Sequence, residues 1–303
     1  MAILILGGHD DDHAAFLLSH LDSLGHDAEM LDSRWFPSDL RLAFDPSSGG
    51  WHVNLPTGRA LAPGEISAVY WRCYNLFDDP SLPDAGQSYI AGNDARGLFE
   101  SFLISLPARW VNGWDAFALH QTKPVQLARV AALGVPIPPT LLGNDPLRVK
   151  EFAAAHPRCI FKPVQGGAHT RRLTPNHLND RNLKNLAVSP VTLQEEVPGT
   201  NIRAFVAGER VLACDVRSEH VDFRDTDDPM IHRHELPPEV AAQSLRIARE
   251  LKLLWTGIDY RLTPEGRYVF LEANPSPMFL GFEARSGLPL TESLVKLLTE
   301  DAR

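Results

Sequence analysis

The sequence has few cysteines and no long hydrophobic run. Its 303 residues include three cysteines, Cys73, Cys159 and Cys214, which are far apart and show no spacing typical of a metal site. An odd number of separated cysteines does not build a disulfide framework, so we expect a reducing, cytoplasmic environment. The apolar run Ala2–Leu6 is too short to cross a bilayer and lacks the layout of a signal peptide. The sequence therefore predicts a protein without a membrane partner.

Basic residues are outnumbered by acidic ones. The 29 Lys and Arg against 38 Asp and Glu give a net charge of −9. A phosphate polymer would be repelled by this balance, which argues against a nucleic-acid partner. A nucleotide is not excluded, because a few local cations are enough to bind its phosphates. Internal repeats and low-complexity tracts are also missing, and the length suits two or three subdomains with a sizeable core.

The N-terminal residues predict the start of a doubly wound layer. The buried-type strand Ile3–Leu6 ends in Gly7-Gly8, and an apolar helical segment follows at 14–24. A dinucleotide site is not expected, since the third glycine of that fingerprint is missing. The intervening cluster from His9 to His13 contains three aspartates. We favour an acidic helix N-terminus there over a metal site, because the helix dipole stabilises negative charge.

A second helix is expected where Leu98, Phe99, Phe102, Leu103 and Leu106 recur at helical spacing. Asn93 and Asp94 are the capping candidates before this helix.

Near the C-terminus, two β-type runs, 258–262 and 267–273, flank a Pro-Glu-Gly turn and predict a hairpin. If the turn is centred on Pro264-Glu265, Asp259 lies opposite Phe270. Glu272 then lies on the face of Asp259, because residues two apart in a strand point the same way. The opposite, apolar face is expected to carry Ile258, Val269 and Leu271.

Asn274 joins Asp259 and Glu272 on the polar face of this hairpin. Two carboxylates in a largely apolar strand pair are costly unless positive charge neutralises them. Oxygen ligands of this kind suit Mg²⁺, with phosphates completing its coordination. The alternative is that Arg261 or Arg267 neutralises the carboxylates.

Six segments upstream of the hairpin, taken in their order and spacing, resemble the ATP-grasp superfamily. They are Thr122-Lys123-Pro124, Leu133–Thr140, Cys159–Pro163, Val164–Thr170, Thr192–Gly199 and Asn201–Val206. The resemblance implies an α/β (α+β) ATP-grasp fold behind a doubly wound-like pre-ATP-grasp domain. The expected divisions are 1–115 for that domain, 116–188 for the small lid subdomain, and 189–303 for the C-terminal subdomain that binds metal and nucleotide.

The same resemblance implies roles for individual residues. Lys123 and Lys162 contact the phosphates of ATP, and Gly166-Gly167 lies in the loop that closes over them. The main chain around Glu195 and Val197 receives adenine, and the carboxylate of Glu195 or Glu196 reaches the ribose.

Further roles concern the reacting phosphate and the metal. The resemblance implies that Arg203 faces the reacting phosphate, and Arg224 is expected as a second catalytic candidate. It also implies that Asp259, Glu272 and Asn274 hold Mg²⁺, with Mn²⁺ as a substitute.

Within the superfamily the chain is most similar to the RimK-like group and to microviridin-type (graspetide) peptide ligases. The residues concerned include Ile66–Arg72, Trp110-Val111-Asn112, Asp222-Phe223-Arg224 and Gly287–Leu290. This implies an ATP-dependent ligase that activates a carboxylate as an acyl phosphate and joins it to an amine or hydroxyl. The alternatives are a glutathione-synthetase-like ligase for free amino acids and a non-catalytic ATP-binding regulatory protein.

The expected partners are ATP and an acidic peptide or amino-acid acceptor, and a homo-oligomer is left open. Trp71, Arg72 and Tyr74 are candidates for gripping an acidic peptide, with Arg72, Arg203 and Arg224 along one cleft. The alternative places Trp71 and Tyr74 in the core and makes Arg72 a surface charge.

Overall fold

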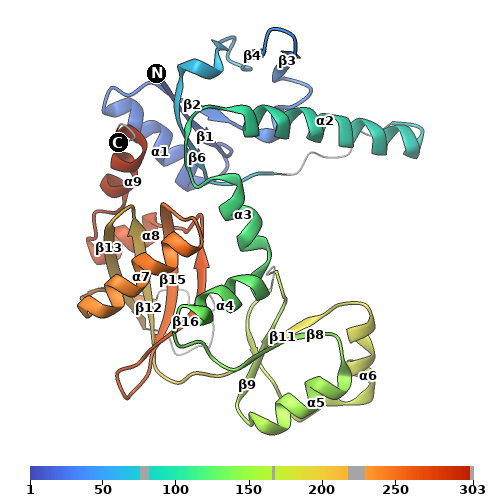
Figure 1. Cartoon of the computed structure of the whole chain (residues 1–303), viewed down its shortest axis with the longest axis vertical. Helices are drawn as coiled ribbons and strands as arrows, with labels where there is room; N and C mark the ends of the chain where they lie inside the picture. The colour runs from blue at the N-terminus through green and yellow to red at the C-terminus, as the bar shows by residue number, and fades with distance from the viewer. Residues whose placement is uncertain (76–81, 166–167, 218–228, 301–303) are drawn as a thin grey trace. The chain divides into compact units, whose positions relative to one another are not determined.

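The computed structural model describes residues 1–75, 82–165, 168–217 and 229–300. The chain forms two compact units (Figure 1). Unit 1 comprises Met1–Trp114, Met278–Leu280 and Thr291–Arg303, and unit 2 comprises Asp115–Pro277 and Gly281–Leu290. The C-terminal segment therefore belongs with the N-terminal unit. Among the helices of the described ranges, none combines the length and hydrophobicity that crossing a bilayer requires.

Unit 1 is built on a four-stranded parallel sheet in the order β2-β1-β6-β7. These strands are β1 (Ala2–Leu6), β2 (Ala28–Leu31), β6 (Ile66–Trp71) and β7 (Arg109–Val111). Every residue of β1 is buried, as a continuous apolar run predicts for an inner strand. Helix α1 (Asp12–Ser23) follows, and the Asp11 side chain caps it by accepting the Ala14 N–H at 2.8 Å. The predicted β-α opening is confirmed.

The long helix α2 of unit 1 begins earlier than the sequence predicts. Asp84, and not Asn93 or Asp94, caps it. Its first turns expose Tyr89 and Ile90 to solvent, so they lack the apolar periodicity from which a helix is predicted. The remaining elements of this part of the chain are η1 (Ser33–Trp35), β3 (Arg41–Asp45), β4 (Gly50–Asn54), β5 (Ala60–Leu61), η2 (Pro63–Glu65), α2 (Ala85–Ser105) and α9 (Leu290–Thr299).

Unit 2 contains a smaller antiparallel sheet in the order β10-β9-β11-β8. Helical segments cover one face of it, where Val149, Leu183 and Leu186 pack with Leu193 of β11. Asp145 caps α5 and Pro146 is its first residue, where its missing N–H costs no hydrogen bond. The elements are α3 (Trp114–Gln121), α4 (Lys123–Ala132), β8 (Thr140–Gly143), α5 (Pro146–Ala155), β9 (Cys159–Lys162), β10 (Arg171–Arg172), η3 (Pro175–Leu178), α6 (Asp180–Leu183), η4 (Lys184–Ala187) and β11 (Val191–Glu195).

The larger sheet of unit 2 has the strand order β14-β13-β12-β15-β16 and is antiparallel throughout. Helices α4 and α7 pack on one face, with Val130 and Ile247 against Ala204, Ile258 and Phe270. The other face carries Phe205, whose ring contacts Phe282 of α8. The elements are β12 (Thr200–Ala207), β13 (Arg210–Arg217), β14 (Met230–His234), α7 (Pro238–Glu250), β15 (Trp255–Leu262), β16 (Tyr268–Asn274) and α8 (Leu280–Ser286).

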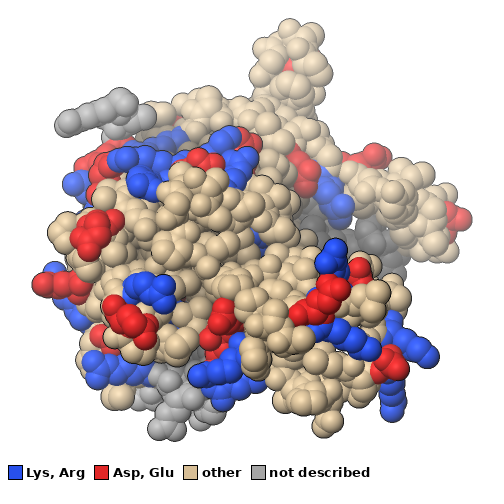
Figure 2. Space-filling view, turned by 60° about the horizontal axis from the view of Figure 1, so that its bottom comes forward, with Lys and Arg blue, Asp and Glu red and all other residues tan. Residues whose placement is uncertain are grey.

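Charges of both signs share the molecular surface. On the face shown in Figure 2, Lys and Arg are interspersed with Asp and Glu, so the acidic excess is not gathered into one patch there. Exposed charges of opposite sign also form pairs, such as Arg249 with Glu209 at 2.5 Å. Such exposed pairs contribute little to stability, because water and salt screen them.

Candidate functional site

A row of polar side chains crosses three adjacent strands of the larger sheet. Arg203 on β12 lies opposite Asp259 on β15, and Asp259 lies opposite Glu272 on β16. Neighbouring strands are about 4.8 Å apart, so side chains on one face of them come within reach of one another. Asn274, two residues after Glu272, lies on the same face by alternation. The opposite face of these strands packs against α4 and α7.

The hairpin register differs from the predicted one by two steps. The prediction pairs Asp259 with Phe270, whereas the structure pairs Tyr260 with Phe270 and Asp259 with Glu272. The first step arises in the turn, which contains a third residue, Gly266, in the left-handed region with a φ of 81°. The second is a register shift between Asp259 and Tyr260. The two shifts cancel in their effect on side-chain direction, so Asp259 and Glu272 still share a face.

The apolar face of the hairpin is therefore composed differently than predicted. Phe270 and Ala273 pack with Ile258 in the core, as the shifted register requires. Val269 lies opposite Arg261 instead, and Leu271 is the extra residue at the register shift between Asp259 and Tyr260. The prediction that Ile258, Val269 and Leu271 together form this face is correct only for Ile258.

The guanidinium of Arg203 holds Asp259 in a two-point ion pair. Its Nε and Nη2 each donate to one carboxylate oxygen at 2.7 Å. The side chains of Arg203 and Asp259 are 9% and 17% exposed. Burial lowers the pKa of Arg203, but the attraction of Asp259 and Glu272 raises it by more. The guanidinium also lies over the ring of Phe282, 4.8 Å from its centroid.

Asp259 is neutralised by Arg203. The alternative that Arg261 or Arg267 neutralises the carboxylates of the hairpin is therefore wrong for Asp259. Arg261 donates through Nε to the Val197 carbonyl at 3.0 Å and through Nη1 to the Asn201 side chain at 2.7 Å. These contacts hold the start of β12 against β15.

The positive charges of both predicted nucleotide lysines, Lys123 and Lys162, stabilise the ionised form of Glu272. The Nζ atom of Lys123, the first residue of α4, lies 3.1 Å from the Glu272 carboxylate. Burial raises the pKa of Glu272, but the attractions of Lys123, Lys162 and Arg203 outweigh it and lower the pKa to about 2. Glu272 is therefore ionised at neutral pH, with positive charge on either side of it.

Three residues that support this row were missed by sequence reasoning. Phe282 lies under Arg203, and the side chain of Gln126 bonds to the backbone of β16. Gly257 is the third, because a Cβ atom there would lie 2.9 Å from the Cβ of Pro277. The one local signal was the position of Gln126, one helical turn after Lys123.

In the segment at the end of β11 that is predicted to receive adenine, two backbone N–H groups already form hydrogen bonds within the protein. The N–H groups of Glu195 and Glu196 donate to the carbonyls of Pro139 and Arg158, at 3.0 and 2.8 Å. The Glu196 carboxylate accepts hydrogen bonds from Arg172, which lower its pKa. The Glu195 side chain is 44% exposed, with His156 at 3.4 Å. The adenine and ribose roles stay predictions.

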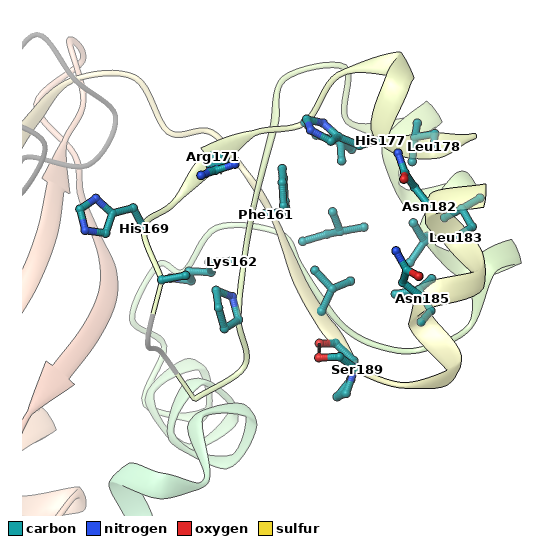
Figure 3. Close-up of a pocket in the computed structure, with 18 residues that line it drawn as sticks. Phe161, Lys162, His169, Arg171, His177, Leu178, Asn182, Leu183, Asn185 and Ser189 are labelled. Carbon is teal, nitrogen blue, oxygen red and sulfur yellow. Dashed lines mark hydrogen bonds between the residues drawn. The ribbon is translucent and has the colours of Figure 1, made fainter. Parts of the chain in front are cut away.

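A cavity of about 510 Å³ lies beside the smaller sheet (Figure 3). Its lining is mainly apolar and includes Phe161, Leu178 and Leu183. Lys162 lies with His169 and Arg171 on the other side of the cavity. Among the predicted site residues that the structure describes, Lys162 is the one that lines it. None of Arg203, Asp259 and Glu272 lines this cavity.

The remaining predicted site residues, Gly166, Gly167 and Arg224, lie outside the described residues. Their roles in closing over the phosphates and in catalysis stay predictions.

The N-terminal aromatic residues form part of a core. Trp71 is 5% exposed and packs against Trp114 and Tyr74 with ring centroids 5.2 and 5.9 Å apart. Arg72 donates to Asp11 at 2.9 Å. The alternative of a core residue therefore holds for Trp71, whereas Tyr74 is half-buried and Arg72, with its side chain 11% exposed, is not a surface charge. The shared cleft of Arg72, Arg203 and Arg224 stays a prediction.

The acidic cluster before α1 is a helix start. Asp11 caps the helix, and Asp10 accepts hydrogen bonds from Arg34. Within the described ranges, no group of three or more His, Cys, Asp and Glu side chains is placed to hold a metal ion.

The donor set on the larger sheet nevertheless fits a hard divalent cation with phosphate ligands. Two carboxylates and one amide, from Asp259, Glu272 and Asn274, lie on one face, and Mg²⁺ commonly takes one or two protein carboxylates with phosphate and water. Mn²⁺ accepts the same oxygen ligands. Lys123 and Arg203 stand next to these oxygens and add charge that suits phosphate.

Comparison with characterised proteins places these features in context. No family model matches the chain. A probable alpha-L-glutamate ligase of Alkalilimnicola ehrlichii is 26% identical over 190 residues, 57% of this chain and 62% of the relative. The matched region thus spans less than two thirds of that relative.

Solved structures match over nearly the whole chain. The macrocyclase MdnC from Microcystis aeruginosa, bound with the precursor peptide MdnA, has a TM-score of 0.87 and 23% identity over 99% of this chain and 100% of its own, which shows the same fold. The ATP-grasp ligase PsnB, complexed with a minimal precursor, has a TM-score of 0.86 and 30% identity over 98% of this chain and 97% of its own. PsnB has also been solved with Mg and ADP. The chain therefore belongs to the ATP-grasp ligases.

Proposed function

We propose that this chain is an ATP-dependent ligase that activates a carboxylate as an acyl phosphate and joins it to an amine or hydroxyl of a peptide. Joining a carboxylate to an amine at neutral pH is uphill, so the carboxyl group has to be activated first. The observation that carries the proposal is the row of Arg203, Asp259 and Glu272, with Lys123 beside it. Oxygen donors and fixed positive charges on one face meet the main demand of phosphoryl transfer, which is positioning and charge neutralisation.

The residues of the row divide this task. Asp259, Glu272 and Asn274 are proposed to hold Mg²⁺ or Mn²⁺, which supplies charge to offset the phosphates when bound. Arg203 offers a rigid fork of N–H donors for the transferring phosphoryl group. Lys123 acts as a mobile point charge at the start of α4.

Residues outside the row complete the nucleotide site in this proposal. Lys162 contacts the phosphates from β9, and the loop containing Gly166 and Gly167 covers them. The main chain at Glu195 and Val197 receives adenine. Of the two hinge carboxylates, Glu195 is the better ribose ligand, because Glu196 is already held by Arg172.

The proposed acceptor is an acidic peptide. MdnC has been solved with a precursor peptide and PsnB with a minimal precursor, and PsnB matches this chain over nearly its whole length. The second candidate is free glutamate, which the similarity to a probable alpha-L-glutamate ligase favours. We also propose a cytoplasmic location, which the free cysteines Cys73, Cys159 and Cys214 support.

Release of ADP and phosphate tests this function. The purified chain with Mg²⁺ is given glutamate alone, an acidic peptide that also contains Ser, Thr and Lys, or neither. Stimulation by the peptide, with a product lighter by one water, is the expected result. Strong stimulation by glutamate alone would support the second candidate and reject the peptide ligase. Nucleotide binding without turnover under any condition would point to a regulatory protein.

Glu272→Gln is the matched variant for this assay. The substitution preserves side-chain size, so the fold should persist. It replaces one carboxylate oxygen with an amide nitrogen and removes the negative charge, which weakens the metal site. We expect turnover to be lost and the far-UV circular dichroism spectrum to be unchanged. Wild-type turnover in this variant would contradict the metal assignment.

A further inference from the structure

The outer strand of the larger sheet carries two of the proposed metal ligands next to an unusual helix contact. β16 is the last strand in the order β14-β13-β12-β15-β16, so among the described strands of this sheet none lies along one backbone edge of it. Glu272 and Asn274 lie near its end and flank Ala273. The end of an edge strand frays readily unless something satisfies its backbone groups.

The side chain of Gln126 supplies both partners that a neighbouring strand would supply. Its Nε2 group donates to the Ala273 carbonyl at 3.0 Å, and its Oε1 atom accepts the Ala273 N–H at 3.0 Å. A primary amide can do both because it carries a donor and an acceptor side by side. Nδ1 of His120 in α3 donates to the same carbonyl at 3.2 Å. Gln126 is 3% exposed, so water does not replace these bonds easily.

This contact also sets the relation between α4 and the strand. Lys123 and Gln126 are three residues apart, so they lie on the same side of the helix. Glu272 precedes Ala273 by one residue, and Lys123 reaches its carboxylate at 3.1 Å. The Ala273 side chain points into the core, which leaves Glu272 and Asn274 on the opposite, polar face. One amide therefore joins the backbone of the ligand segment to the helix that carries the phosphate-binding lysine.

We infer that Gln126 is a positioning residue for the ligase reaction, which holds Glu272 and Asn274 in register with Lys123. The inference rests on the proposed function of that row. Gln126 touches neither nucleotide nor metal in this scheme; it acts through the backbone of Ala273. Partners of this kind, which orient metal ligands without binding the metal, typically matter about 10- to 100-fold for metal affinity or activity.

The test compares Gln126→Met with Ser244→Ala in the full-length chain. Methionine matches the length of glutamine and packs well but cannot form either hydrogen bond. Ser244 is fully buried on α7 against the same sheet face, and its hydroxyl bonds to the Val240 carbonyl and the Tyr260 hydroxyl at 2.9 Å. Ser244→Ala therefore removes buried hydrogen bonds from the same core without touching β16.

The measurement is ADP binding by calorimetry over a range of Mg²⁺ concentrations and without Mg²⁺. Gln126→Met should raise the Mg²⁺ concentration needed for half-maximal ADP binding by about 10- to 100-fold. Binding without Mg²⁺ should change little, and Ser244→Ala should show wild-type Mg²⁺ dependence even if its melting temperature falls as far. Hydrogen exchange at the Ala273 amide should accelerate only in Gln126→Met.

Two results would overturn this inference and leave the proposed function unaffected. One is wild-type Mg²⁺ dependence in Gln126→Met, and the other is an equal shift in Ser244→Ala, which would indicate general destabilisation. If Gln126→Met fails to fold, Gln126→Glu carries the test. Its carboxylate still accepts the Ala273 N–H but loses the donor, and its added negative charge would by itself favour a cation. A higher Mg²⁺ concentration for half-maximal ADP binding in Gln126→Glu supports the inference, and an unchanged concentration rejects it. Absence of Mg²⁺-dependent ADP binding in the wild-type chain would overturn the proposed function itself.

Discussion

The substitution Asp259→Asn tests how much the unliganded site depends on its central ion pair. Asp259 and Arg203 are 17% and 9% exposed and share two hydrogen bonds of 2.7 Å. The substitution leaves a guanidinium that is almost buried without its carboxylate. Breaking a buried pair in this way costs about 3–5 kcal/mol. Because Asp259 keeps some solvent contact and Glu272 still attracts Arg203, we expect the lower end, about 3 kcal/mol.

Glu209→Gln is the control, since it breaks an ion pair in the same unit. Glu209 and Arg249 approach more closely, at 2.5 Å, but their side chains are 75% and 63% exposed. Exposed pairs contribute about 0–1 kcal/mol. If burial and not contact distance decides the cost, Asp259→Asn should lower the free energy of unfolding far more than Glu209→Gln.

The assay is urea unfolding at pH 7 without nucleotide or Mg²⁺, followed by tryptophan fluorescence. Equal losses in Asp259→Asn and Glu209→Gln would refute the reasoning. A third chain, with Arg203→Met and Asp259→Leu together, should recover most of the stability, because an apolar pair of similar volume removes both buried charges. The same chain should not regain Mg²⁺-dependent nucleotide binding.

Three further outcomes are expected. Lys123→Ala and Lys162→Ala should each weaken ATP binding by about 1–3 kcal/mol through a lost charge-assisted contact, and unchanged affinity in both, by calorimetry, would contradict the nucleotide site. Arg172→Met should destabilise the chain only slightly at pH 7, because the Arg172 side chain is 63% exposed and water screens its pair with Glu196. Hydrogen bonding from Arg172 lowers the pKa of Glu196 below 4.5, so the pair stabilises above that pH and its effect is lost as the pH falls through the folded-state value. Urea unfolding across this pH range checks the sign, and an effect that grows in acid would be inconsistent with it. Gly257→Ala should cost about 1–3 kcal/mol by overpacking against the neighbouring proline ring, and an unchanged melting temperature would show that the ring moves aside.

Several elements of this protein follow from local sequence. The start of α5 is an example, because Asp145 accepts the first free N–H groups of the helix and Pro146 needs no hydrogen bond there. The common face of Asp259 and Glu272 is another, since side-chain direction alternates along a strand. Both depend on interactions within a few residues, which the order of side chains already contains.

The start of α2 and the hairpin register do not follow so directly. The first turns of α2 are exposed, so apolar spacing does not mark them. The register of β15 and β16 depends on the left-handed conformation of Gly266 and on a shift after Asp259, and each moves the pairing by one residue. Because the two shifts cancel, the predicted common face of Asp259 and Glu272 holds, although neither shift was predicted.

The sequence by itself determined which residues form the polar row, whereas only the tertiary structure decided how their charges are paired. Asp259 and Glu272 stand out because charged residues recur among apolar ones in strands of known period, and Arg203 is expected from the resemblance to the ATP-grasp superfamily. That Arg203 holds Asp259, that Lys123 reaches Glu272, and that Gln126 bonds to β16 depend on strands and a helix far apart in the chain. Such contacts arise when the core of α4, α7 and the larger sheet packs, because packing sets register and distance between segments that have no local interaction.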